Sequence, residues 1–249
     1  MRMSDGQNRL STAIPSPKNG IRSISPSLLS SCPVSRLFRV SSVFRLWLLL
    51  SSSLAIAQSP DAQFLSGLRD RQLFELAQRY CLDRLAAEGL AARTQSELTV
   101  ELIRSQALHA ANRPPQDRAA LWQAARQTAA DFVRRSPQHP PGILVQVQDA
   151  LTPLAQGELG RQEYEAGALS GAELEPVRKA LRESAQLLET RDQQLTKEIP
   201  LRRRIEPRDD ELSADALFSL QQHIEHQLAR SYRNQALLYE PQSDDRVAL

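Results

Sequence analysis

The spacing of apolar residues after Gln58 is the feature that most narrows the possible folds. In each long segment of residues 58–249, large apolar residues recur at steps of three and four, and proline or glycine separates the segments. Such steps place side chains on one face of an α-helix, whereas a half-buried strand needs alternation at every second residue. With nine glycines and 5% aromatic residues, the chain lacks the turns and strands typical of β-sandwiches and barrels. We therefore expect an all-α fold.

Six helical segments are expected, with breakers between them. Pro115 suits the first turn of the third segment, Pro153 is expected to kink or divide the fourth, and Ser213 followed by Asp215 is typical of a helix start. Short loops between helices of this length favour antiparallel hairpins, so we expect an α-solenoid or an irregular bundle. The segments cover residues 61–90, 96–111, 115–133, 143–159, 173–199 and 213–239.

The expected organisation has four parts. Residues 1–57 form an N-terminal extension without a fold and a leader, and residues 58–199 form the helical-repeat region. Residues 200–212 form a linker bracketed by Pro200 and Pro207, whose three consecutive arginines are expected to be solvated rather than to hold an anionic partner. Residues 213–249 hold a C-terminal helix and, at Ser243, what reads as the start of a truncated further repeat. The three arginines are Arg202, Arg203 and Arg204.

The leader is the most specific signal in the sequence. Arg36, Arg39 and Arg45 precede an apolar run that starts at Leu46 and ends in small residues at Ala57. A basic region, an apolar region and an A-x-A-like exit are typical of a secretory signal peptide. The run is too short to cross the roughly 30 Å hydrocarbon layer as a stable helix. We expect cleavage after Ala57, a periplasmic or extracellular protein, and no stable membrane span after cleavage.

Two other readings of the leader stay open, an uncleaved signal anchor and an organellar transit peptide. The transit peptide has some support, because residues 1–45 are rich in serine and arginine and nearly free of acid. A start further downstream would need a codon other than that for methionine. Cys32 precedes the apolar run, so it is not a lipoprotein cysteine and would be removed. Cys81 then stands alone in the mature chain, which excludes an internal disulfide.

The net charge of +2 hides an acidic body. Setting aside residues 1–57, which carry seven basic residues and one acidic residue, leaves 24 basic and 28 acidic residues, a net charge of −4. Nucleic-acid binding depends on clustered Lys and Arg that neutralise phosphates. We therefore expect no nucleic-acid partner. The seven basic residues are Arg2, Arg9, Lys18, Arg22, Arg36, Arg39 and Arg45.

Residues 64–85 resemble one unit of the tetratricopeptide repeat (TPR) family. Leu68, Phe74, Ala77, Cys81 and Leu85 are separated by six, three, four and four residues, the separations at which TPR helix pairs place their core residues. The small side chain at Ala77 lets the second helix approach the first. The resemblance implies a helical-repeat protein of a bacterial envelope that binds proteins or peptides on a concave surface and is not an enzyme.

The sequence departs from the TPR pattern at four positions. Asp61 stands where these repeats usually carry tryptophan, and Leu65 stands where they carry glycine. Gln72 lies near the usual turn glycine, and Gly89 replaces the terminal proline. No clean 34-residue recurrence is found elsewhere in the chain.

No residue pattern predicts a catalytic, cofactor or metal site. His223 and His226 share a helix face, but helical zinc motifs place their histidines four apart and need a third ligand. His109 is expected to act as a cation at a helix end, and His139, between prolines, has no assigned role. Cys81 and Trp122 are expected in the core, although Trp122 could instead line a peptide groove.

The expected function is therefore that of an exported scaffold whose partners are other envelope proteins or peptides, with no cofactor. The alternative is a structural spacer of the envelope that self-associates as a coiled coil. A leucine recurs at every seventh residue of the fifth segment, which is typical of a coiled-coil seam and gives a possible homo-oligomer interface. These residues are Leu174, Leu181, Leu188 and Leu195.

Overall fold

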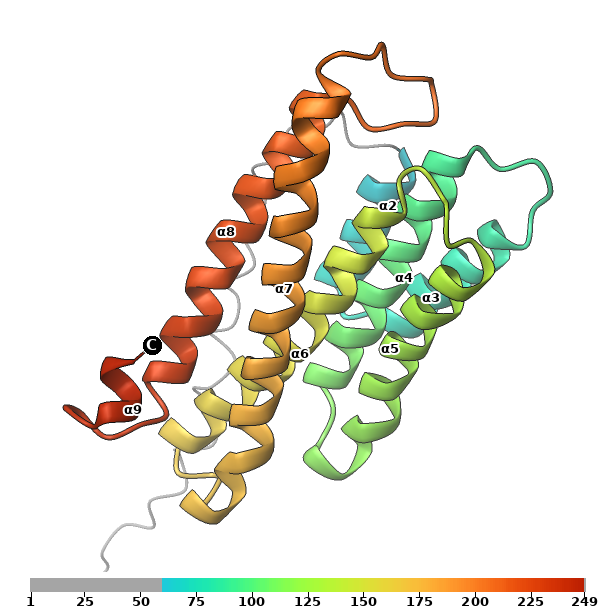
Figure 1. Cartoon of the computed structure of the whole chain (residues 1–249). Coiled ribbons are helices and arrows are strands. Elements are labelled where there is room, and N and C mark those ends of the chain that lie inside the picture. Colours follow the sequence, from blue (N-terminus) through green and yellow to red (C-terminus); the bar gives the residue numbers. More distant parts are fainter. Residues whose placement is uncertain (1–59, 249) are drawn as a thin grey trace, which may run out of the picture. The chain divides into compact units, whose positions relative to one another are not determined.

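The computed structural model describes residues 60–248, and these residues form helices and no strand (Figure 1). The expected all-α fold is confirmed. The described residues belong to one compact unit, Leu54–Leu249. The helices are α2 (Pro60–Asp70), α3 (Phe74–Leu85), α4 (Ala92–Ala111), α5 (Arg118–Arg135), α6 (Gly142–Glu165), α7 (Leu174–Arg202), α8 (Ala214–Ala236) and α9 (Asp244–Val247), with 3-10 turns at Pro115–Asp117 and Gly171–Glu173.

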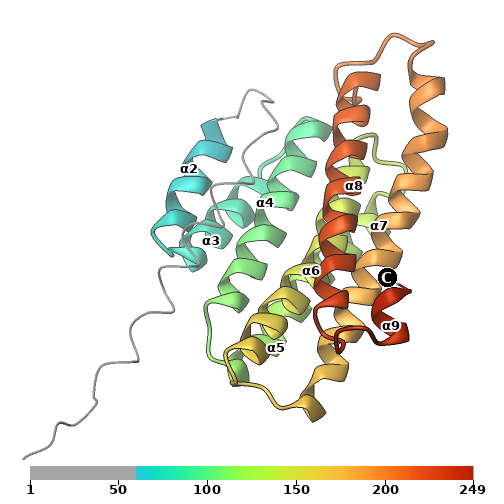
Figure 2. The same cartoon turned by 90° about the vertical axis from the view of Figure 1, so that its left-hand side faces the viewer.

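The helices are stacked in the order in which they occur along the chain. In one layer α2 packs on α4, α4 on α6, and α6 on α8. In a second layer α3 packs on α4, α5 packs on both α4 and α6, and α7 packs on both α6 and α8. Among the described residues, the extensive contacts thus join helices that are neighbours or next-but-one neighbours along the chain. Figure 2 shows α2 and α3 at one end of this stack and α7 and α8 at the other.

Helix α6 is the central helix and is enclosed on nearly all sides. Ile143 packs in a cluster with α7 and α8, whereas Val145 packs in a cluster with α4 and α5. An α-helix that is apolar around its whole circumference needs this kind of burial. The buried positions of α6 are Gly142, Ile143, Val145, Val147, Gln148, Ala150, Thr152, Pro153, Leu154, Gly157, Glu158 and Gly160.

Two glycines of α6 allow α7 to approach closely. A Cβ atom on Gly157 would lie 2.6 Å from Cδ2 of Leu181, and one on Gly160 would lie 2.5 Å from Cγ2 of Val177. Real Cβ atoms do not come this close to another heavy atom. The two glycines, one helical turn apart, therefore set the separation of α6 and α7 along this stretch.

The apolar spacing alone predicted one continuous segment at residues 61–90, whereas the TPR resemblance implied a helix pair with a turn near Gln72. The structure has two helices, because the chain turns at Arg71–Leu73 with Gln72 in the left-handed region at φ 60°. The amide of Leu73 donates to the carbonyl of Leu68 at 2.9 Å, which closes the turn without a glycine. Helix α6 is not divided at Pro153. The Pro153 ring is fully buried, and this packing offsets the cost of about 3 kcal/mol for proline inside a helix.

The linker expected at residues 200–212 begins later than predicted. Helix α7 continues through Pro200 to Arg202, and Nη1 of Arg202 lies 2.7 Å from a carboxylate oxygen of Glu211. Arg202 is thus paired, whereas Arg203 and Arg204 are exposed. The predicted cap of the next helix is confirmed, since the amide of Ala216 donates to Oγ of Ser213 at 3.1 Å.

The leucines of the fifth expected segment pack within the chain. Leu181, Leu188 and Leu195 are completely buried, and Leu174 is 3% exposed. Leu188 and Leu195 contact the apolar faces of α6 and α8, whereas Leu174 and Leu181 pack against Leu154. The seven-residue spacing therefore belongs to an intramolecular core, and these side chains offer no surface to a second copy.

No helix of the described residues combines the length and the apolar character needed to span a membrane.

Replacing Gly157 with alanine should destabilise the fold. The new methyl group would overlap Leu181, and overpacking of this kind costs about 1–3 kcal/mol. Urea unfolding of Gly157→Ala and Gly160→Ala, compared with the wild-type chain, measures this loss.

The matched control is Gly67→Ala in α2, where the added Cβ would meet only the flexible end of Arg71. Because alanine favours the helix, this variant should gain up to about 1 kcal/mol. Equal effects at Gly67 and Gly157 would contradict the close approach of α6 and α7.

Candidate functional site

The histidine pair of α8 lies at the surface without further ligands. His223 is half-buried and His226 is exposed, and the described residues contain no group of three or more side chains able to hold a metal ion. Burial lowers the pKa of His223, and the charges of Arg104, His226 and Arg230 lower it further. Because Arg104 belongs to α4, His223 faces the side of the stack on which α4, α6 and α8 lie next to one another.

His109 is not the cationic helix cap that the sequence suggests. Its ring stacks on Phe74, with centroids 5.7 Å apart, and its Nε2 accepts a hydrogen bond from Nε of Arg113 at 2.9 Å. Burial, followed by the charge of Arg113, lowers the pKa of His109, although Glu75 opposes this shift. His109 therefore acts as a neutral acceptor that joins α4 to α3.

His139 connects the loop before α6 to the first turns of α4. Its Nδ1 lies 3.2 Å from Oγ of Ser96, and its Nε2 lies 3.2 Å from Oε1 of Gln95. The edge of its ring meets Phe132. Burial lowers the pKa of His139, with a smaller opposing effect from Asp210. The contacts of His139 are those of a residue that fixes a loop.

Cys81 and Trp122 both lie in the core, as expected. Cys81 is completely buried, and burial raises the pKa of its thiol to about 12, so the thiolate is not formed near neutral pH. Trp122 is 6% exposed and packs against Ala107 and Ala110 of α4. Trp122 also borders a pocket that is lined by residues of α5, α6 and α7.

The structure contains a buried ion pair between α6 and α8 that no pattern in the sequence predicts. Glu158 is 3% exposed, and its two carboxylate oxygens accept from Nη2 of Arg230 at 2.9 and 3.0 Å. Nδ2 of Asn234 donates to the same carboxylate at 2.8 Å. Burial raises the pKa of Glu158, and Arg230 opposes that shift. The group is fully hydrogen-bonded, and it therefore serves to hold α8 against α6.

The most site-like feature is a pocket on the face formed by α5, α6 and α7. It has a volume of about 310 Å³ and is open to solvent. Trp122, Leu159 and Val177 form its apolar wall, and Nη1 of Arg118 lies 2.5 Å from the carboxylate of Glu163 at its rim. Apolar walls with a few polar groups at the rim are typical of binding pockets.

An ionic group continues this face toward the other end of α6. Arg126 of α5 contacts Glu183 of α7, and its Nε lies 3.7 Å from Oδ1 of Asp149 on α6. Burial raises the pKa of Asp149, which Arg126 and Arg191 lower and Glu183 raises. Oppositely charged side chains from three helices thus meet beside the pocket, and with Arg191 the group holds two positive and two negative charges.

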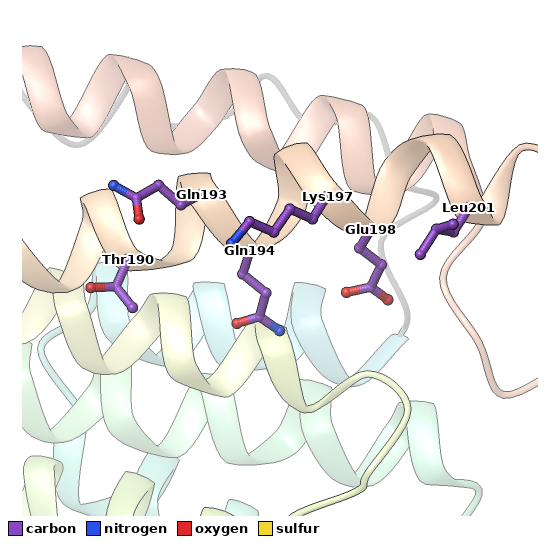
Figure 3. Close-up of a pocket in the computed structure, with 6 residues that line it drawn as sticks. All are labelled: Thr190, Gln193, Gln194, Lys197, Glu198 and Leu201. Carbon is purple, nitrogen blue, oxygen red and sulfur yellow. The ribbon is translucent and has the colours of Figure 1, made fainter.

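A polar stretch of α7 lies beyond the ionic group (Figure 3). It borders a shallow hollow of about 440 Å³, and the side chains of Thr190, Gln194 and Glu198 point toward α6 in the figure. Arg191 joins the two regions, because its Nη1 donates to Oε1 of Gln194 at 3.1 Å. The hollow is bordered by α7 alone, through Thr190, Gln193, Gln194, Lys197, Glu198 and Leu201.

We refer to the pocket, the ionic group and the polar stretch together as the α5–α7 face. Of the residues weighed in the sequence as candidates for chemistry or binding, only Trp122 lies there. The sequence contained no local signal for this face, because its residues come from three helices separated by two loops. No family model, curated protein or solved structure matches the chain.

The histidines predict how stability depends on pH. When the pKa of a histidine is lower in the folded chain than in the unfolded chain, the unfolded chain takes up the proton first as the pH falls. The unfolding free energy that is present above about pH 6.5 is therefore lost as the pH falls toward the folded-state pKa. His109, His139 and His223 all shift in this direction. We expect His223→Gln to lose less unfolding free energy than wild type between pH 7.5 and 5.5.

Urea unfolding at the two pH values measures the difference, with Gln222→Ala at the exposed, uncharged neighbouring position as the control. A pH dependence of His223→Gln equal to that of wild type would show that burial does not affect the His223 ring as described.

Proposed function

We propose that the protein is an exported helical-repeat scaffold that binds other proteins or peptides of the cell envelope and catalyses no reaction. The observation that carries this proposal is the α5–α7 face, where an apolar pocket, a charge-balanced ionic group and a polar stretch follow one another along α6 and α7. The order of these surfaces, apolar, then charged, then polar, is complementary to a peptide in which apolar and polar side chains alternate.

The stacking of the helices supports a repeat architecture of the TPR-like class. Each described helix packs on its near neighbours in the chain, which is the contact pattern of solenoid proteins. Because α5 and α7 both pack on α6, α6 forms the base of the surface between them. The ionisable side chains that come together, such as Glu158 with Arg230, join helices rather than converge on a reacting group.

The dimensions of the α5–α7 face suit a short extended segment. Gln156 borders the apolar pocket, and Asp149 lies seven residues earlier on the same helix, a distance of about 10.5 Å along the axis. Three residues of an extended chain cover about 10 Å. A partner segment of about four residues would therefore place an apolar side chain beside Trp122 and its polar groups beside Asp149 and Arg126.

Export is supported by the leader, which lies outside the described residues. The basic region that ends at Arg45, the apolar run from Leu46 and the small residues up to Ala57 suit cleavage before Gln58. Removal of the leader would leave all the described helices, which begin at Pro60. The periplasm or the extracellular space is the proposed location.

A photoreactive amino acid placed at Ala119 tests the binding role in cells that express the full chain. Ala119 is exposed and borders the apolar pocket, so a bound partner would lie within reach. We expect covalent adducts of defined mass after illumination, in the extracytoplasmic fraction. Mass spectrometry of the same material should show a chain that begins at Gln58.

The matched control carries the same amino acid at Ala229, which is exposed on the outer side of α8. Adducts that form equally well at Ala229, or none at Ala119, would contradict binding at the α5–α7 face. An unprocessed chain in the cytosol would contradict export independently of binding.

A further inference from the structure

Four of the ten large apolar side chains that are exposed among the described residues lie on α2, α3 and the turn between these helices. Phe64 is 48% exposed, Leu73 45%, Leu76 52% and Leu82 53%. Phe64 packs on the ring of Tyr80, at a centroid distance of 4.8 Å. The helix pair α2–α3 lies at one end of the described stack (Figure 2). We call this surface the α2–α3 face.

At the opposite end of the stack, the exposed apolar side chains are spread over several elements. The outer side of α8 carries Phe218, which is 44% exposed, whereas the others lie in the last turn of α7, in the α7–α8 loop, directly after α8 and in α9 (Leu201, Ile205, Leu237 and Val247). The exposed residues along the same side, among them Gln222, Glu225 and Arg233, are polar or charged. Terminal units of repeat proteins need a polar outer side for solubility. Most of the outer side of α8 is polar, whereas Leu76 and Leu82 lie among the charged residues of the α2–α3 face and leave it partly apolar.

Charges on the α2–α3 face follow a pattern that is complementary to itself. Arg71, Glu75, Arg79 and Asp83 are exposed, lie four residues apart and alternate in sign. If a second copy of α3 runs antiparallel about an axis at residue 77, Glu75 lies opposite Arg79 of that copy, and this pair occurs twice. Asp83 lies toward the turn that holds Arg71 of the second copy, whose Nη1 donates to the carbonyl of Gly67 at 2.8 Å. Opposite charges thus meet at the two helical positions beside the axis.

The apolar residues follow the same antiparallel register. Leu76 lies beside the axis and would meet its own counterpart, and Leu73 would lie within one residue of Leu82 of the second copy. Within one chain, Arg79 pairs with Asp83 at 2.9 Å, and Glu75 pairs with Arg113 at 3.0 Å. The side chains of these four residues are 46–75% exposed. Such exposed pairs contribute little and can exchange partners.

We propose that the α2–α3 face binds the α2–α3 face of a second copy of the chain, joining two stacks end to end in a two-fold symmetric dimer. The contact is isologous, because one surface meets its identical counterpart, and it closes at two copies. It covers Leu76 and its apolar neighbours. The leucines of α7 take no part in it, because they lie in the intramolecular core. The proposal does not depend on the α5–α7 face.

Light scattering after size exclusion tests the dimer on residues 58–249, which contain every described helix of the compact unit. Wild type should show twice the monomer mass at high concentration and dissociate on dilution. Leu76→Glu places two carboxylates beside the axis and should raise the dissociation constant by at least about 30-fold, as expected for a central interface residue. Phe218→Glu, at a similarly exposed position of α8, should leave the dimer unchanged.

Charge reversal tests the register. Arg79→Glu and Glu75→Arg should each weaken the dimer, because each creates two like-charged pairs across the axis. The double variant restores opposite charges and should restore dimerisation, while circular dichroism confirms that all variants stay helical. A wild-type monomer at every concentration would overturn the proposal, as would a Phe218→Glu effect equal to that of Leu76→Glu or a double variant no better than the single ones.

Discussion

The close packing of α7 on α6 is the contact on which the rest of the fold depends. It requires glycine at positions 157 and 160, because a Cβ atom at either would occupy the space of Leu181 or Val177. With the backbones this near, Leu181 and Val177 fill the space beside α6 directly. Helix α7 in turn presents Leu188 and Leu195 to α8, so the position of the last long helix follows from the same contact.

Burial of α6 on nearly all sides explains both the Glu158–Arg230 ion pair and the α5–α7 face. On one side, the Glu158 carboxylate is enclosed and needs the guanidinium of Arg230 and the amide of Asn234. Removing one partner of such a pair typically costs about 3–5 kcal/mol, whereas the intact pair gives little net stability. On the other side, α5 and α7 each pack on α6, and the surface between them becomes the α5–α7 face. One central helix thus organises the core, the link to α8 and the proposed binding surface.

The periodicity of the sequence located most helices because burial of one face imposes steps of three and four. It failed where local exceptions occur. The turn at Gln72 contains no glycine or proline, so the apolar spacing alone indicated one segment over residues 61–90, and only the TPR resemblance implied a helix pair. Pro200 lies in the last helical turn, where it does not end α7. The leucines of α7 show that a seven-residue spacing predicts a packed seam but not whether its partner belongs to the same chain.

The polar features were harder to predict, because they join residues far apart in the sequence. Glu158 and Arg230 are 72 residues apart, and nothing near either residue indicates the other. His109 looked like a helix-end cation because its ring contacts with Phe74 and Arg113 were not visible in the sequence. The glycines at 157 and 160 were a readable signal, since two glycines three apart inside an apolar helix indicate close helix packing.

Amide hydrogen exchange measured helix by helix tests the central role of α6 most directly. Slow exchange marks segments that open only when the whole structure unfolds. The structure predicts that amides between residues 146 and 160 exchange most slowly, and more slowly than those of α2, α3 and the exposed end of α7. Exchange in α6 as fast as in α2 and α3 would contradict a fold organised around this helix.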